Sequence, residues 1–175
     1  MKKILFVMVM ACVSMTASAQ AFIEGKIGLG YQKTEDVDGI FSFGIAPTIG
    51  FDFNDKFAVG VQLSEELNIQ GDYRANTVGL TPFARYTYAE LGKAKLYVDG
   101  GVIFGFTNIK NLDSTGFTWG FAITPSISYP LTDLVSLVGS LGSLSWQNSS
   151  FDGASSSSFN ISLLRQASIG LRFDI

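Results

Sequence analysis

The chain has 175 residues, of which 47% are hydrophobic, and a formal net charge of −3. This length suits one domain, and an acidic balance without a basic stripe excludes a nucleic-acid-binding protein of the usual kind. There is no histidine, and the single cysteine is Cys12. A chain that loses Cys12 with its amino-terminal segment has no disulfide framework, no zinc–thiolate site and no cysteine nucleophile.

Residues 1–19 have the pattern of a secretory signal peptide. Two lysines precede an apolar run, and Ala17–Ala19 has the small-x-small pattern of a cleavage site. The apolar run is shorter than the ~20 residues that a membrane-spanning helix needs. A lipoprotein signal with acylation at Cys12 is the alternative, and cleavage after the small-x-small pattern is preferred. We expect residues 1–19 to be a signal peptide and residues 20–175 to be one domain.

No later apolar run is long enough for a membrane helix, although the mean hydropathy is +0.30. Instead, eight segments alternate between apolar and small or polar residues with the period of two of a β-strand. The segments are Phe22–Tyr31, Phe41–Phe53, Phe57–Ser64, Thr77–Tyr88, Lys95–Phe106, Phe117–Tyr129, Leu134–Trp146 and Phe159–Ile175. Short turns and longer polar connections, predicted as loops, follow these segments in alternation. The turns are residues 54–55, 89–94 and 130–133, and the loops are residues 32–40, 65–76, 107–116 and 147–158.

The polar side of each segment decides which face points outward. In Phe41–Phe53 and Phe117–Tyr129 this side is mostly Gly, Ser, Thr and Ala, whereas a water-exposed face would be rich in Lys and Glu. Small residues suit the crowded interior of a narrow barrel. The opposite side carries aromatic residues too bulky to share the inside of eight strands, which favours a membrane barrel over a soluble barrel with an apolar interior.

Aromatic residues gather at two heights along the segments, with aliphatic residues between them. Near the long loops lie Tyr31, Phe41, Phe43, Phe104, Phe106, Phe117, Trp119, Trp146 and Phe159. Near the short turns lie Phe51, Phe53, Phe57, Tyr86, Tyr88, Tyr129 and Phe173. Two aromatic girdles around an aliphatic belt are expected at the two membrane–water interfaces of a transmembrane barrel.

Three segments contain a proline at an equivalent position, namely Pro47, Pro82 and Pro125. Each proline has an aliphatic residue two positions before it and an aromatic residue four positions after it. We interpret these segments as equivalent strands of one repeating hairpin architecture. Proline lacks an N–H group, so each is expected to remove one ladder hydrogen bond, with its ring directed at lipid.

The signal, the eight segments and the final stretch Ala167–Ile175 resemble the small outer-membrane β-barrel family of gram-negative bacteria, of the OmpX or OmpA-transmembrane-domain type. The resemblance covers the whole chain after residue 19. It implies an all-β fold, an eight-stranded antiparallel up-and-down transmembrane β-barrel. It also implies a place in the cell outer membrane, with both termini in the periplasm and the long loops extracellular.

The same resemblance implies partners. The barrel-assembly machinery reads an amphipathic last strand in this family, for which Leu171, Phe173 and Ile175 fit, although the last residue is Ile rather than Phe. Periplasmic chaperones are expected during biogenesis, and outer-membrane lipid and lipopolysaccharide around the finished barrel, which is expected to be a monomer.

Six charged residues on the inward side lie near the periplasmic ends of their segments. They are Glu24, Lys26, Asp52, Arg85, Asp99 and Arg172. Three acids and three bases are costly in a low-dielectric lumen unless they pair. We interpret them as a structural plug, the lumen charge cluster, rather than as a gate or ion path. Arg85 is predicted to pair with Asp99, and Arg172 with Glu24. Above the cluster we expect a small vestibule lined by Gly28, Gly30, Gly44, Gly60, Gly79, Gly105, Gly120 and Gly142.

Catalytic chemistry has little support in the sequence. The outer-membrane acylases, deacylases, phospholipase and omptin proteases use a histidine, and this chain has none, so no catalytic residue and no cofactor are predicted. The acidic segment Glu35–Asp38 is interpreted as a solvated loop rather than a calcium site. A structural or surface-interaction barrel and a narrow porin-like conduit for small or apolar solutes remain, and the plug favours the first.

Overall fold

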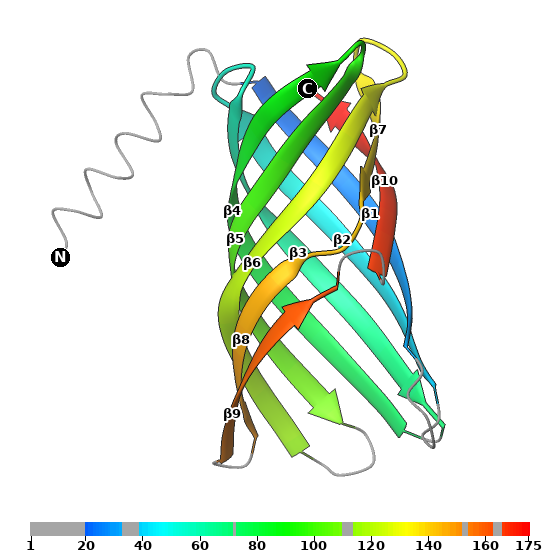
Figure 1. Ribbon diagram of the computed structural model, residues 1–175, viewed down its shortest axis with the longest axis vertical. Coiled ribbons are helices and arrows are strands. Elements are labelled where there is room, and N and C mark those ends of the chain that lie inside the picture. Colours follow the sequence, from blue (N-terminus) through cyan, green and yellow to red (C-terminus); the bar gives the residue numbers. More distant parts are fainter. Residues whose placement is uncertain (1–19, 33–38, 72, 110–113, 152–153, 163–165) are drawn as a thin grey trace, which may run out of the picture.

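The computed structural model describes residues 20–32, 39–71, 73–109, 114–151, 154–162 and 166–175, which form one antiparallel sheet closed into a barrel (Figure 1). The strands are β1 (Gln20–Gln32), β2 (Ile40–Asp52), β3 (Phe57–Gln70), β4 (Tyr73–Leu91), β5 (Ala94–Ile109), β6 (Ser114–Pro130), β7 (Val135–Ser140), β8 (Leu144–Phe151), β9 (Ala154–Ile161) and β10 (Gln166–Asp174). β7 and β8 are halves of the seventh strand, and β9 and β10 of the eighth, so the predicted eight-stranded barrel is confirmed. Within the described ranges, no helix has the length and hydropathy for a membrane span.

The barrel closes between its first and last strands. β1 pairs with β10 from Phe22↔Asp174 to Gly30↔Gln166, and the Ile175 amide donates to a β1 carbonyl at 2.8 Å. All the other strands pair in the up-and-down order of the chain. We call the end with the short turns and Ile175 the turn end, and the opposite end the loop end.

The short turns are built by local hydrogen bonds and one glycine. Asn54 Oδ1 accepts from the Phe57 amide at 3.0 Å, and Thr132 Oγ1 accepts from the Val135 amide at 3.0 Å. Gly92 has a φ of +64° in the turn between β4 and β5, a conformation that favours glycine. These turns fix the order and register of neighbouring strands.

The strands continue farther toward the loop end than the apolar alternation predicts. β3 and β4 pair to the last residue of β3, so the prediction that residues 65–76 form a loop is wrong. The same correction applies to residues 107–109, 114–116, 147–151 and 154–158, which lie in strands. On β3 and β4 the outward side is interrupted by Glu65, Arg74 and Asn76, so the hydropathy signal weakens while the backbone ladder continues. Polar pairs such as Asn76 Nδ2 to Glu65 Oε1 at 3.1 Å line this region.

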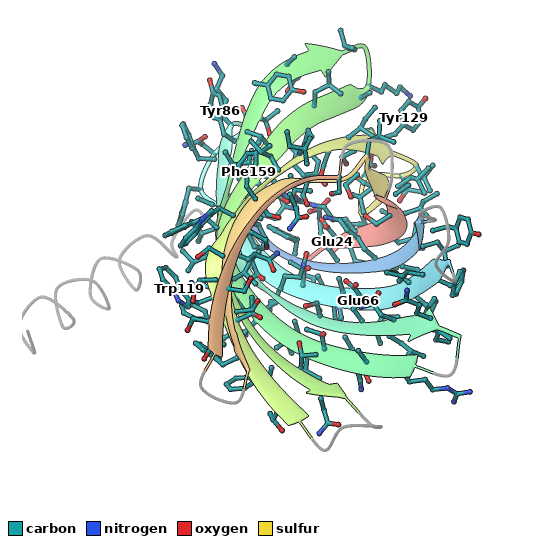
Figure 2. The ribbon with its side chains drawn as sticks, turned by 60° about the horizontal axis from the view of Figure 1, so that its bottom comes forward. Glu24, Glu66, Tyr86, Trp119, Tyr129 and Phe159 are labelled. Atoms are coloured by element: carbon teal, nitrogen blue, oxygen red, sulfur yellow. The ribbon has the colours of Figure 1, made fainter. Side chains whose placement is uncertain are left out.

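Apolar side chains point outward and small or charged ones inward, as predicted. On β1, Ile27 is 52% exposed whereas the adjacent Lys26 is 7% exposed. Figure 2 shows Tyr86 and Tyr129 toward one end of the wall and Trp119 on its outer side. A continuous apolar band of this kind is typical of a lipid-facing surface.

Three aromatic side chains, Phe22, Phe83 and Tyr97, point inward. The Phe22 ring lies against Gly50, and Phe83 Cζ lies 2.7 Å from the position that a Cβ at Gly60 would occupy. A larger residue at either glycine would displace the ring on the adjacent strand. Two of the lumen glycines are therefore explained by rings that fill the space a side chain would take.

The three prolines interrupt the backbone ladder at equivalent positions. The register of β2 with β3 skips two residues at Pro47, and that of β4 with β5 skips two at Pro82. Pro125 lies where β6 changes its partner from β7 to β8. On its other side each proline keeps a register partner, and these are Gly25, Val61 and Val98. The missing N–H thus affects only one side of each proline-bearing strand.

The seventh and eighth strands, predicted as continuous over Leu134–Trp146 and Phe159–Ile175, are each broken in two. Residues 141–143 form a bulge opposite Pro125, and Gly142 has a φ of +93°, which few residues other than glycine adopt. The inward face therefore changes parity, from Ser136 in β7 to Ser145 in β8, both of which are buried.

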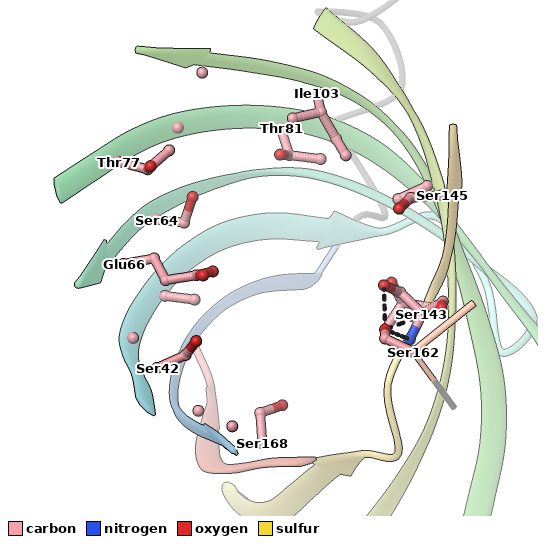
Figure 3. A pocket seen from close by; sticks show the side chains of 18 of the residues that line it. Ser42, Ser64, Glu66, Thr77, Thr81, Ile103, Ser143, Ser145, Ser162 and Ser168 are labelled. Carbon is pink, nitrogen blue, oxygen red and sulfur yellow. Dashed lines mark hydrogen bonds between the residues drawn. The ribbon is translucent and has the colours of Figure 1, made fainter. Parts of the chain in front are cut away.

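Ser143 and Ser162 connect the two breaks (Figure 3). The Ser143 amide donates to Ser162 Oγ at 3.0 Å, and the Ser162 amide donates to the Ser143 carbonyl at 2.9 Å. These two hydrogen bonds hold the β8–β9 hairpin at the level of Pro125, where β6 changes its partner from β7 to β8.

Candidate functional site in the barrel lumen

The lumen charge cluster lies inside the turn-side half of the barrel. Figure 2 shows Glu24 within the ring of strands. The six side chains come from β1, β2, β4, β5 and β10, and none is more than 27% exposed. The structure therefore brings all six predicted residues into the lumen, where they form two ion-paired groups.

The first group is centred on Arg85. Its guanidinium forms a two-pronged contact with Asp99, with Nε to Oδ1 at 2.7 Å and Nη2 to Oδ2 at 2.9 Å. Arg85 Nη1 also reaches Glu24 Oε2 at 3.1 Å, and Lys26 Nζ lies 2.6 Å from Glu24 Oε1. Two acids and two bases thus compensate one another across the lumen, and the expected pairing of Arg85 with Asp99 is present.

The second group is centred on Arg172, and its partners correct the prediction. Glu24 and Arg172 are register partners on β1 and β10, yet their side chains do not form an ion pair. Arg172 Nη2 instead contacts Asp52 and lies 2.6 Å from Asp174 Oδ1. Both arginines would otherwise converge on one carboxylate, and Glu24 is already engaged by Arg85 and Lys26.

Aromatic rings separate the two guanidinium groups. The centroid of the Phe22 ring lies 4.0 Å from Arg172 Cζ and 5.4 Å from Arg85 Cζ. The Tyr97 ring centroid lies 4.0 Å from Arg85 Cζ. Cation–π contacts of this kind are favourable, most of all where the cation has lost water. The charged layer is therefore packed with rings rather than with solvent.

Sequence reasoning missed Phe22, Tyr97 and Asp174 as members of this layer. Their signal was present, because Phe22 shares the inward parity of Glu24, Tyr97 that of Asp99, and Asp174 that of Arg172. The prediction placed named aromatic residues on the lipid-facing side and left the rings that share the inward parity without a place.

The charged layer divides the lumen into two cavities. The loop-side cavity has a volume of about 830 Å³ and reaches down to Lys26 and Asp99. The turn-side cavity has a volume of about 410 Å³ and reaches up to Arg85 and Tyr97. Glu24, at 0% exposed, lies between them.

The loop-side cavity is lined mainly by hydroxyl groups and glycines. Figure 3 shows Ser42, Ser64, Thr77, Thr81 and Ser145 directed into it from β2, β3, β4 and β8. Six of the glycines expected in the vestibule line it, and they are Gly28, Gly30, Gly44, Gly79, Gly105 and Gly142. Gly60 and Gly120, also expected there, instead face the Phe83 ring and the backbone of β8.

The described residues contain no group of His, Cys, Asp and Glu side chains arranged to hold a metal ion. Three features considered in the sequence lie outside the described residues. They are the acidic segment Glu35–Asp38, the cleavage pattern before residue 20, and Cys12. Leu171, Phe173 and Ile175 point outward from the last strand and are 40%, 46% and 70% exposed.

Comparisons with known proteins agree on the architecture. The family model described as "Outer membrane protein beta-barrel domain" matches residues 4–166. Neisserial surface protein A is similar in structure, with 13% identity and a TM-score of 0.59 over 90% of this chain and 99% of that one. A major outer membrane protein from Thermus thermophilus has 13% identity and a TM-score of 0.54 over 90% of this chain and 100% of that one. The N-terminal β-barrel domain of Pseudomonas aeruginosa OprF has 17% identity and a TM-score of 0.50, with the same coverage. Comparison with curated protein sequences found no match.

Proposed function

The chain belongs to the outer membrane protein β-barrel family, and from this premise we propose that it is a structural or surface-interaction barrel whose lumen is blocked by the lumen charge cluster. The resemblance inferred from the sequence is confirmed at the level of the family. The role within that family is our proposal.

The observation that carries the proposal is the ion-paired layer between the two cavities. A water-filled pore needs a continuous open path for water. Here the side chains of Arg85 and Glu24 are only 4% and 0% exposed, and Arg85 Nη1 lies 3.1 Å from Glu24 Oε2. Eight strands enclose little more than the side chains that fill them. The layer therefore supports a barrel that does not conduct, and it disfavours the porin-like alternative.

We propose that the turn end faces the periplasm and the loop end faces outward. Short turns on the periplasmic side and longer connections outside are the rule for bacterial outer-membrane barrels. Residues 1–19 would then be the signal peptide that directs export. The outward hairpins would contact lipopolysaccharide or surface partners, and the last strand would meet the assembly machinery during biogenesis.

We also propose that the protein is not an enzyme. The chain has no histidine, which removes the usual proton carrier at neutral pH. The carboxylates of Glu24 and Asp99 form ion pairs with the side chains of Lys26 and Arg85, so neither is available as a catalytic base. A monomeric anchor for its own surface hairpins is the function that this arrangement supports best.

Conductance across planar lipid bilayers tests the proposal. The unmodified protein is expected to give no stable open current, because the charged layer closes the lumen. The double variant Arg85→Ala with Arg172→Ala removes both guanidinium groups and is expected to give a small conductance.

Arg74→Ala is the matched control, since Arg74 is exposed at the loop end of β4 and lies outside the layer. It should behave as the unmodified protein does. A large ohmic conductance from the unmodified protein would reject the blocked lumen and favour the conduit.

A further inference from the structure

The loop-side half of the wall is open between β1 and β9. β9 pairs with β8 over its whole length, while β1 pairs with β10 only as far as Gly30↔Gln166. No strand in the described part of the chain pairs with the second edge of β9. Figure 1 shows β9 beside β8 on one side of the barrel, with the loop-side end of β1 on the other.

The loop-side cavity reaches the outer surface through this opening. Leu29 and Tyr31 on β1 have the parity of lipid-facing residues and are 57% and 63% exposed, yet they line the cavity. Ile161 on β9 is 58% exposed and lines it from the opposite side. No described strand lies between these two sides, so the cavity opens toward the membrane at this place as well as toward the loop end.

The inside of the cavity suits a neutral, hydroxyl-rich group. Serine and threonine hydroxyls and amides of Gln147 and Asn160 provide both donors and acceptors. The bases and acids at its floor are paired with each other. Glu65 and Glu66 add two negative charges, and their described partners are the neutral amides of Asn76, at 3.1 Å, and Asn68, at 2.9 Å. An anionic group would therefore meet unfavourable charge, whereas a sugar or polyol would find hydrogen-bonding partners on several strands.

The outside of the opening suits an alkyl chain. Phe159, 62% exposed, and Ile161 form its β9 side. Phe159 is the register partner of Trp146, whose ring centroid lies 5.3 Å from that of Trp119. An apolar rim beside a polar interior is complementary to a molecule that is itself apolar at one end and polar at the other.

The unpaired edge of β9 also requires a polar partner. Backbone groups at hydrocarbon depth must be satisfied within the protein or by polar groups lining a cavity. Residues 159–161 pair with the part of β8 that carries Leu144 and Trp146, at the height of the lipid-facing Phe121 and Ile123. A hydroxyl-bearing head group at the lumen side of the opening would supply these hydrogen bonds where lipid tails cannot.

We infer that the loop-side cavity binds an amphipathic molecule with an uncharged, hydroxyl-rich head group and an alkyl chain. The head lies in the lumen above the lumen charge cluster, and the chain passes between β1 and β9 into the membrane. A cavity of about 830 Å³ is within the range of small-molecule sites, which are of the order of 300–1,000 Å³. The blocked floor makes this a binding pocket with access from the side, rather than a pore across the membrane.

Backbone amide NMR of the protein in phosphatidylcholine nanodiscs tests this inference. Dodecyl maltoside, maltose and dodecyl sulfate are added separately in small equal amounts. Dodecyl maltoside is expected to give saturating shifts at Gly30, Ser145 and Ser162. Maltose lacks the chain and dodecyl sulfate lacks the neutral head, so neither should give saturating shifts at these residues.

A pair of variants locates the site. Ser145→Phe fills the lumen beside β8 and is expected to abolish the saturating shifts. Val61→Phe places the same ring on the outer face of β3, away from the opening, and should leave them unchanged. The three-ligand comparison on the unmodified protein decides the question even if Ser145→Phe fails to fold.

Three results would overturn the inference. Equal saturation by maltose would mean that the chain and the side opening are not used, and equal saturation by dodecyl sulfate would mean that the head group is not selected. Shifts confined to outward residues such as Phe159 would show only the lipid layer around the barrel. None of these outcomes would change the conductance expected of the blocked lumen.

Discussion

Arg85 holds the lumen charge cluster together because it contacts two carboxylates from two different strands. It is 4% exposed, and its loss would leave Glu24 and Asp99 in a poorly hydrated layer. Lys26 would still compensate Glu24, but Asp99 has no second cation among the described ion pairs. The residue therefore joins β1, β4 and β5 through ion pairs as well as through its contacts with aromatic rings.

Arg85→Ala is expected to reduce the free energy of unfolding by about 3–5 kcal/mol, because breaking a buried ion pair leaves a buried charge uncompensated. Urea-induced unfolding in phospholipid vesicles measures this. Arg74→Ala removes the same charge at an exposed position and should change stability by no more than about 0.5 kcal/mol. Similar losses in the two variants would contradict the role assigned to Arg85.

Gly142 is the residue on which the broken seventh strand depends. Its φ of +93° lies where residues other than glycine are strained, so Gly142→Ala is expected to cost about 1–3 kcal/mol. Gly100→Ala is the matched control, since a Cβ there meets nothing within 4 Å. The same urea unfolding compares the two, and equal stability would mean that the bulge adapts without strain.

At the scale of strands, face assignment could be predicted and strand continuity could not. The period of two correctly placed Ile49 outward and Glu24 inward, because the odd-numbered residues of β1 and β2 face outward along both strands. At Gly142 the inward-facing parity changes within one predicted segment. The flanking residues Leu141 and Ser143 give no sign of this change in the sequence. The strand ends near residues 65–76 were missed because polar residues interrupt the outward side there, namely Glu65 on β3 and Arg74 and Asn76 on β4, although Leu67 and Ile69 continue the alternation.

Side-chain partners across the lumen were predictable only where register alone decides them. Arg85 and Asp99 are register partners and do pair. Arg172 and Glu24 are register partners as well, but Arg85 competes with Arg172 for Glu24. The Phe22 ring lies between the two guanidinium groups. Choice among several partners depends on rotamers and packing, which a one-dimensional pattern does not contain.

Charge placed in the lipid-facing belt is expected to impair assembly. Ile49 is 55% exposed on the outer face of β2, and Arg facing lipid at the midplane costs roughly 2–4 kcal/mol. The folded fraction, read from heat-modifiable mobility on gels, should fall for Ile49→Arg. Ser157→Arg, on the exposed end of β9, should fold as the unmodified protein does. Equal tolerance would mean that the faces are reversed.

At the scale of the whole molecule, closure divides the barrel into a sealed half and an open half. The turn-side half has every strand paired on both sides and contains the charged layer. The loop-side half contains the larger cavity, the bulge at Gly142 and the free edge of β9. The proposed blockage therefore belongs to one end of the molecule, and the proposed binding to the other.

Separation of the two cavities is the central claim, and thiol accessibility tests it most directly. Once residues 1–19 are removed the chain has no cysteine, so Thr81→Cys reports on the loop-side cavity and Ser136→Cys on the turn-side cavity. The variants are folded into preformed vesicles, and protease cleavage of the hairpins identifies which end faces outward. A small charged thiol reagent added on the loop side should label Thr81→Cys and leave Ser136→Cys unlabelled. Equal labelling of both positions from that side would show a continuous aqueous path and contradict the blocked lumen.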